Sequence, residues 1–101
     1  MAIKKGIYAA SMSIFNEDLS LDADSTILHS ERLIKQGLHG AILFGSTGCA
    51  QLISSSEKRN LIDKLKDSKE KDHFIIGTGA NALNENIELM KHSIKNGINR
   101  F

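Results

Sequence analysis

The chain has 101 residues and a formal net charge of +1, with 41% apolar and 25% charged residues. This length allows one domain or part of one, and the composition is ordinary for a globular protein. The charge offers no basic field for nucleic acid, and no apolar run approaches the ~20 residues of a membrane span. We therefore expect neither nucleic acid nor membrane as a partner.

The cysteine and histidine content excludes two kinds of site. Cys49 is the only cysteine, so no internal disulfide can form, which is typical of a reducing, cytoplasmic setting. The four histidines are scattered along the chain, without pairs at metal-ligand spacing. We expect no metal site.

The first predicted elements are a short apolar strand at about residues 6–11 and a helix at about residues 23–36, joined by a polar loop. Asp22 is a good N-cap for this helix, because its side chain can accept a hydrogen bond from a free N–H of the first turn. Gly37 follows the helix, where a left-handed residue is favoured. This part of the chain therefore predicts one strand-loop-helix unit.

The stretch of greatest functional interest is GAILFGSTG, residues 40–48. Its continuous apolar run predicts a strand at about residues 40–44, buried on both faces as in parallel sheets. The Gly-Ser-Thr-Gly that follows allows the backbone to approach an anionic group, with two hydroxyls as neutral donors. Since ligands gather at the carboxyl ends of strands in α/β proteins, this loop is the best functional candidate.

Two further helices and a strand follow. Ser54 and Glu57 form a capping-box pair, which predicts a helix at about residues 55–67. A strand is predicted at about residues 73–77, and a helix at about residues 83–96, with Asn81 or Asn84 as its cap. The apolar residues of this last helix recur at helical spacing and predict its buried face. They are Leu83, Ile87, Met90 and Ile94.

The alternation of strands and helices predicts a parallel sheet with right-handed crossovers, either doubly wound or part of a (β/α)8 barrel. The end of the chain, IKNGINRF, repeats the pattern of IKQGLHGAILF at residues 34–44. This repeat predicts a fourth strand that begins at about residue 99. We therefore expect the sequence to be the N-terminal part of a longer protein.

The motifs resemble those of the dihydrodipicolinate synthase / N-acetylneuraminate lyase family. The resemblance rests on GSTG after the second strand, GTGAN at residues 77–81 after the third, and the S-x-x-E-K-R helix start between them. It extends over nearly the whole chain. Family members are class I aldolase-type (β/α)8 barrels, so residues 1–101 would form the first three to four strands of such a barrel.

The resemblance also implies an activity for the full-length protein. It would condense or cleave pyruvate or a related 2-oxo acid and an aldehyde through a lysine Schiff base, without a cofactor. The most similar activity is that of 4-hydroxy-tetrahydrodipicolinate synthase, in lysine biosynthesis. N-acetylneuraminate lyase and 2-keto-3-deoxy sugar acid aldolase are the alternatives. Family members are homo-oligomers, dimers or tetramers.

By the same resemblance, Ser46 corresponds to a proton-relay position and Thr47 to the residue that holds the 2-oxo acid carboxylate. Gly45 and Gly48 would let backbone N–H groups join these side chains, since a carboxylate needs several convergent donors. The alternative is that both hydroxyls only bond the loop to itself as turn residues.

The chain departs from the family pattern at several positions. Cys49 stands where a glutamate is usual, and Ile14 where a proline is usual. Asn81 and Glu85 match positions of a lysine-effector site in feedback-inhibited synthases. The positions near Ala50, Gln51, Ser55 and Lys58 lack the histidine-rich pattern of some members. We therefore do not expect allosteric inhibition by lysine.

The Schiff-base lysine of the family lies on its sixth strand, outside this sequence. A nucleophilic lysine needs burial to lower its pKa. The lysines here precede the first strand or lie on predicted helices and charged turns, so none is an expected substitute. The 101-residue chain by itself should be inactive.

Three other interpretations remain open. Gly77, Gly79 and Ala82 give a weak G-x-G-x-x-A dinucleotide fingerprint. Cys49, beside a glycine loop, is a candidate reactive thiol, although a small apolar filler is the simpler role. Finally, three βα units leave open strand edges, so the chain could be a non-catalytic fragment that associates with itself.

Overall fold

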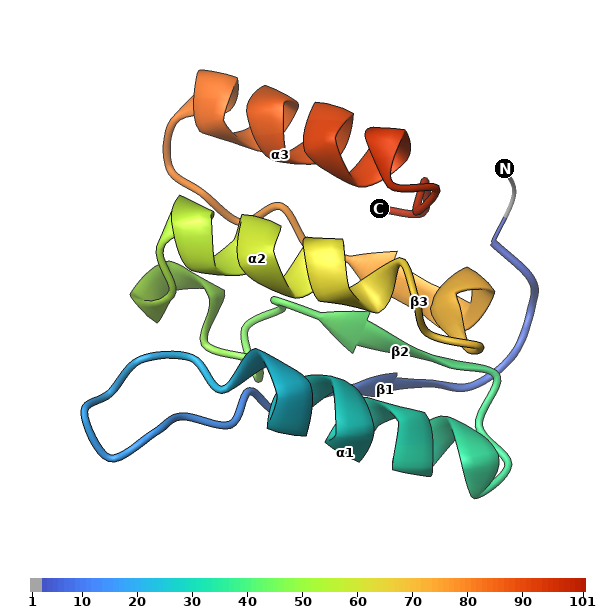
Figure 1. The fold of residues 1–101 in the computed structure, drawn as a ribbon. Helices are drawn as coiled ribbons and strands as arrows, with labels where there is room; N and C mark the ends of the chain where they lie inside the picture. Colours follow the sequence, from blue (N-terminus) through green and yellow to red (C-terminus); the bar gives the residue numbers. More distant parts are fainter. Residues whose placement is uncertain (1–2) are drawn as a thin grey trace.

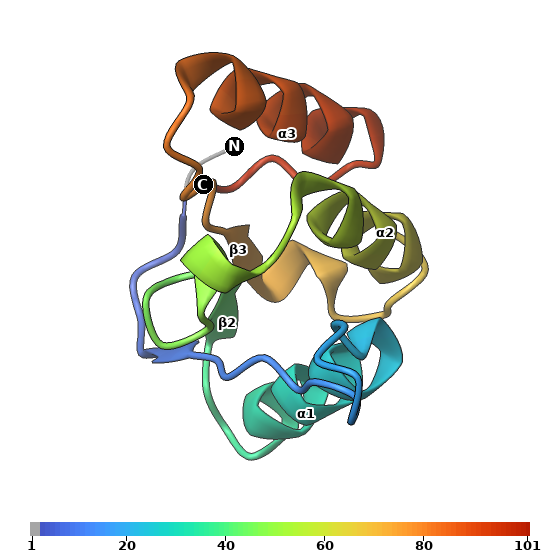
Figure 2. The same ribbon diagram turned by 90° about the vertical axis from the view of Figure 1, so that its left-hand side faces the viewer.

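Residues 3–101 are described by a computed structural model, in which three parallel strands lie in the order β1-β2-β3. Ala41 of β2 pairs with Ala9 on one side and with Phe74 on the other. The three helices surround one side of these strands (Figures 1 and 2). The expected parallel β-α alternation is thus confirmed. The elements are β1 (Tyr8–Ala10), α1 (Ala23–Lys35), β2 (Gly40–Leu43), α2 (Ser55–Leu65), β3 (Phe74–Ile76) and α3 (Leu83–Lys95), with 3-10 turns at Ala50–Leu52 and Lys71–His73.

The strands are shorter than the sequence pattern predicts, and no strand begins at residue 99. The backbone at this point nevertheless follows the sheet, because the N–H of Ile76 in β3 donates to the carbonyl of Arg100 over 2.9 Å. This single backbone hydrogen bond joins the segment at Arg100 to β3, but one bond is too few for the segment to count as a strand.

The core lies between the sheet and the helices. Ala41 and Leu43 of β2 are buried, whereas Ile42, which points the other way, is only half-buried. The expected burial on both faces of β2 is therefore incomplete within residues 3–101. Helix α2 supplies the middle of the core with side chains that are fully buried, namely Leu61, Ile62 and Leu65.

The first two helices begin as the sequence predicts. The Asp22 carboxylate accepts a hydrogen bond from the Ser25 N–H over 3.0 Å at the start of α1. At α2, the Ser54 hydroxyl accepts from the Glu57 N–H and the Glu57 carboxylate accepts from the Ser54 N–H, each over 3.2 Å. Gly37 has a φ of 114°, so the left-handed end of α1 is also confirmed.

The prediction for helix α3 is wrong in two respects. Its N-cap is Ala82, which has no side chain to cap the helix, and neither predicted asparagine takes that role. The predicted buried face is largely exposed, with Leu83 at 78%, Ile87 at 51% and Ile94 at 54%. Leu89 and Ser93 are buried instead. They lie about 100° around the helix from the apolar stripe, on the side that packs against α2.

Glu57 does more than cap α2, because its carboxylate also accepts a hydrogen bond from the N–H of Leu21 over 2.7 Å. The backbone donors of Leu21 and Ser54 hold the pKa of Glu57 below its ordinary value. A carboxyl group whose pKa is lowered in the folded state stabilises the fold above the unfolded-state pKa. That contribution is lost as the pH falls through the folded-state pKa.

We expect Glu57→Gln to lower the free energy of unfolding by about 1–2 kcal/mol at pH 7, measured by urea titration, since two backbone donors lose their charged acceptor. At pH 3 the two proteins should differ much less. Glu88→Gln, at an exposed position of α3, is the matched control and should have little effect. An equal Glu57→Gln difference at both pH values would contradict this role.

None of the helices within residues 3–101 has the length and apolar character needed to cross a membrane.

Candidate functional site

The loop after β2 is closed by its own backbone. The N–H of Cys49 donates to the carbonyl of Ser46 over 3.1 Å, and the N–H of Ala50 donates to that of Gly45 over 3.3 Å. Two non-glycine residues with left-handed backbones flank the loop, Phe44 at φ 59° and Cys49 at φ 56°. Such conformations cost energy outside glycine and are often found at functional sites. The sequence contains no signal for them.

The two hydroxyl side chains of the loop face outward. Ser46 and Thr47 are exposed, and neither hydroxyl makes a hydrogen bond to any residue between 3 and 101. The hydroxyls themselves therefore do not bond the loop to itself, although the Ser46 carbonyl does so as a turn residue. Both hydroxyls keep their full capacity to donate to, and accept from, a ligand.

The two glycines of the loop have different surroundings. A Cβ at Gly48 would lie 3.0 Å from the carbonyl oxygen of Ser11, and Gly48 also accepts a 2.6 Å hydrogen bond from the Ser13 hydroxyl. A Cβ at Gly45 would meet nothing within 4 Å. Only Gly48 is therefore required by close packing, and the space beside Gly45 is open.

The GTGAN loop after β3 packs against this first loop. The N–H of Gly77 donates to the carbonyl of Leu43 over 2.8 Å, and Gly77 lies so close to the Phe44 carbonyl that a Cβ would overlap it. Gly77 therefore accommodates the neighbouring backbone, which is not the role it would have in a dinucleotide fingerprint. The carboxyl ends of β2 and β3 thus form one continuous edge.

Asn86 fixes the GTGAN loop, a role that the sequence does not signal. Its side-chain oxygen accepts a hydrogen bond from the Ala80 N–H, and its side-chain nitrogen donates to the Ala80 carbonyl, both over 3.0 Å. This pair of bonds takes the place of a side-chain cap at the start of α3. It fixes the backbone immediately before Asn81.

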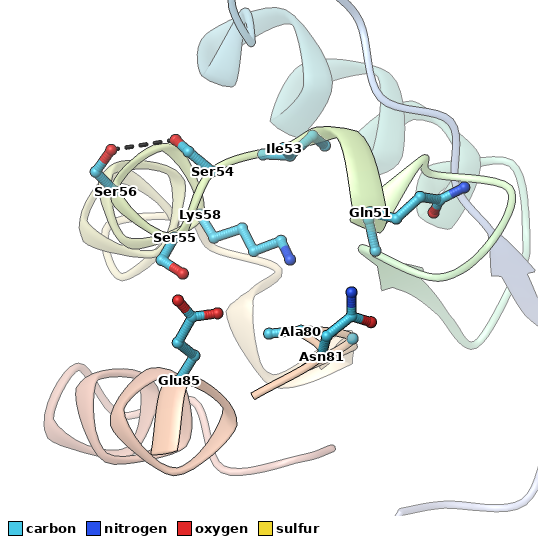
Figure 3. A pocket seen from close by; sticks show the side chains of 11 residues that line it. Gln51, Ile53, Ser54, Ser55, Ser56, Lys58, Ala80, Asn81 and Glu85 are labelled. Atoms are coloured by element: carbon cyan, nitrogen blue, oxygen red, sulfur yellow. Dashed lines mark hydrogen bonds between the residues drawn. The ribbon is translucent and has the colours of Figure 1, made fainter. Parts of the chain in front are cut away.

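A pocket of about 490 Å³ lies beside this edge, between the start of α2 and the start of α3 (Figure 3). Asn81 and Glu85, the predicted effector-site residues, both line it. Ala50, Gln51, Ser55 and Lys58 line it as well. Ser46 and Thr47 do not, so the structure separates the two sets of predicted site residues.

Lys58 contradicts the expectation that no lysine of the chain is buried. It is only 3% exposed, and its Nζ lies 5.9 Å from the centre of the Phe44 ring. Burial lowers the pKa of Lys58, and the attraction of Glu85 opposes this effect. The signal was present in the sequence, since Lys58 precedes Leu61, Ile62 and Leu65 at the spacing of one helix face.

Cys49 is half-buried, and its sulfur lies 3.9 Å from the carbonyl oxygen of Thr47. The thiol thus contacts the loop backbone at its base. No charged group contacts it within residues 3–101. Both the filler role and the reactive-thiol role remain predictions.

Comparison with known proteins places the whole arrangement in one family. A sequence model described as the dihydrodipicolinate synthetase family matches residues 3–100. The chain belongs to this family. GSTG and GTGAN are therefore the strand-end loops of a dihydrodipicolinate synthetase-family chain, and the match extends over nearly every residue that the structure describes.

Curated relatives agree with this assignment. A 4-hydroxy-tetrahydrodipicolinate synthase of Rhizobium meliloti is 35% identical over 94 residues, which is 92% of this chain and 32% of the relative. An uncharacterized DapA-like lyase of Pyrococcus furiosus is 33% identical over 89 residues, which is 88% of this chain and 30% of the relative. The chain thus spans about a third of the length of these family members.

Solved structures of related proteins show the same fold. YagE of Escherichia coli K12, a dihydrodipicolinic acid synthase family protein in complex with pyruvate, superposes with a TM-score of 0.82 at 30% identity. The match covers 95% of this chain and 33% of YagE. The 2-keto-3-deoxygluconate aldolase of Picrophilus torridus gives a TM-score of 0.84 over 97% of this chain and 35% of its own, at 23% identity. The three βα units therefore have the fold of the first part of a TIM barrel.

Proposed function

We propose that this chain contributes the 2-oxo acid site of a Schiff-base lyase or aldolase. The enzyme would condense or cleave pyruvate or a related 2-oxo acid and an aldehyde, in the manner of 4-hydroxy-tetrahydrodipicolinate synthase. The observation that carries the proposal is the pair of exposed, unbonded hydroxyls of Ser46 and Thr47 at the strand edge. The lysine that forms the Schiff base would come from another part of the completed barrel.

Each loop residue has a separate role in this proposal. Ser46 relays a proton near the Schiff base, since a hydroxyl can accept and donate in one step. Thr47 donates to the carboxylate of the 2-oxo acid, and backbone N–H groups at Gly45 and Gly48 add further donors. No charged side chain is needed for this kind of carboxylate binding, because several neutral donors converge on one group.

The runner-up is a 2-keto-3-deoxy sugar acid aldolase. The supporting observation is that a 2-keto-3-deoxygluconate aldolase variant of Sulfolobus solfataricus superposes on 88% of this chain and 30% of its own, with a TM-score of 0.76 and 26% identity. N-acetylneuraminate lyase activity remains a further alternative. The loop after β2 would serve the 2-oxo acid in each case, so the aldehyde would be distinguished by other parts of the barrel.

Two further proposals concern the effector pocket and self-association. Asn81 and Glu85 would form part of an effector pocket, but Lys58 lines the same pocket, and the protonated form of this side chain would repel a cationic effector such as L-lysine. The chain would assemble as a homo-oligomer in its complete form, or associate with itself through the open edge of β1 and the part of the β3 edge that the segment at Arg100 leaves uncovered.

A chimeric barrel tests the proposed function. Residues 3–101 replace the matching first third of the Rhizobium meliloti synthase, and the purified chimera is treated with borohydride in the presence of pyruvate. We expect a reduced pyruvate adduct on a lysine of the relative's portion, together with turnover when an aldehyde is supplied. A folded chimera that forms no pyruvate adduct, under conditions in which the unaltered synthase does, would contradict the proposal.

A further inference from the structure

The amine of Lys58 lines a pocket and makes no hydrogen bond or ion pair within residues 3–101. Its contact with the Phe44 ring is weak at 5.9 Å. Figure 3 shows the amine end directed into the open space between Gln51 and Asn81. The stem of the Lys58 side chain is buried while its amine opens into the pocket, and this burial lowers the pKa of Lys58, which raises the share of the neutral, nucleophilic amine.

The Glu85 carboxylate faces the same pocket from the side opposite Lys58 (Figure 3). Glu85, near the start of α3, lines the pocket together with the Ser55 hydroxyl at the start of α2 (Figure 3). Glu85 is the charged group that acts on Lys58 through space. Glu85 also lines an adjoining pocket of about 280 Å³, together with Arg59 and Glu88. The amine and an acid–base group therefore share one cavity with room for a small molecule.

We propose that Lys58 is a carbonyl-reactive amine and that its pocket takes small neutral aldehydes, with which Lys58 forms a Schiff base. Glu85 accepts the proton that the ammonium loses. The Nζ lone pair then adds to the carbonyl carbon, and proton transfer from Nζ to oxygen gives a carbinolamine. Glu85 returns its proton to the carbinolamine hydroxyl, which leaves as water while the C=N bond forms. The step consumes neither oxidant nor reductant.

The charges of the pocket select the class of carbonyl compound. The Glu85 carboxylate repels a second carboxylate, which disfavours 2-oxo acids. The Ser55 hydroxyl and the Asn81 amide offer hydrogen bonds to a hydroxyl group on the ligand (Figure 3). A small hydroxyaldehyde such as glycolaldehyde therefore fits best. This site is separate from the 2-oxo acid site and does not depend on the proposed function.

Reductive trapping tests the proposal directly on the 101-residue chain. The chain is incubated with limiting glycolaldehyde and cyanoborohydride, and the modified lysines are located by peptide mass mapping. We expect the first adduct at Lys58, several-fold ahead of the other lysines, and at a lower pH than for exposed lysines. Lys58→Arg should remove this adduct, because a guanidinium forms no Schiff base here. Lys64→Arg is the matched control on the same helix, at an exposed lysine, and should retain it.

Further measurements distinguish a selective reactivity of Lys58 from the labelling of any solvent-exposed lysine. Glu85→Gln should slow the labelling of Lys58 several-fold without changing that of Lys64, and pyruvate should label Lys58 more slowly than glycolaldehyde. Labelling spread evenly over the lysines would overturn the proposal. So would an unchanged rate of first labelling in a Lys58→Arg chain whose circular dichroism matches that of the original. The chimera experiment maps a different lysine, so the two proposals can fail independently.

Discussion

Replacing Ser46 by alanine should lower kcat of the chimeric barrel by about 10²–10⁴-fold and change KM for pyruvate little. The hydroxyl is exposed and unbonded in the structure, so its removal leaves no partner unsatisfied within residues 3–101. The fold should therefore be unaffected, and the loss should fall on proton transfer, for which a positioned group contributes a factor of this size.

The comparison variants for Ser46 make the result specific. Ser46→Thr keeps a hydroxyl at the same position and should recover much of the lost kcat. Thr47→Val should instead raise KM for pyruvate about tenfold, because one hydrogen bond to a carboxylate is worth about 1.5 kcal/mol. Steady-state kinetics with pyruvate varied at saturating aldehyde would separate the two effects. Equal loss of kcat in both variants would show that the residues do not divide the roles as proposed.

Local signals in the sequence predict the framework of the fold well. The caps at Asp22 and Ser54 use hydrogen bonds between residues three positions apart, so a short stretch of sequence is sufficient to identify them. The apolar run at residues 41–44 likewise predicts a buried strand and a following loop. The parallel order of the sheet follows from the alternation of these elements.

Helix α3 shows where such signals fail. Its most regular apolar stripe is exposed, while Leu89 and Ser93 face α2. Periodicity shows that a helix has an apolar face, but packing with a distant element decides which face is buried. Within residues 3–101, nothing covers the stripe at Leu83, Ile87 and Ile94.

The candidate site was predicted only in part, for a similar reason. The positions of Ser46 and Thr47 after β2 follow from the motif, but the motif carries no signal for the left-handed backbones of Phe44 and Cys49, and Phe44 lies against Gly77 of the next loop. The burial of Lys58 runs against its residue type, because lysine is rarely buried. Its helical spacing from Leu61 favoured burial, and in the structure that spacing outweighs the usual preference of the residue type.

The second large effect is expected at Gly77, whose backbone packs against Leu43 and Phe44 at the end of β2. An added methyl group would overlap the carbonyl of Phe44 and lie 2.9 Å from that of Leu43. Both are backbone atoms of β2 and its loop, so neither can rotate away as a side chain would. The Gly77 N–H also donates to Leu43, and a shift of the backbone would lengthen this bond.

We therefore expect Gly77→Ala to lower the free energy of unfolding by about 2–3 kcal/mol, the upper range for overpacking. In a chain of this size the melting temperature should fall on the order of 10–20 °C, measured by circular dichroism. Gly45→Ala is the matched control at the other strand-end loop, where a Cβ meets nothing within 4 Å. It should change the free energy of unfolding by less than about 0.5 kcal/mol. If the two variants melted alike, Gly77 would not be a tight contact between the loops, and the position of Phe44 would need another cause.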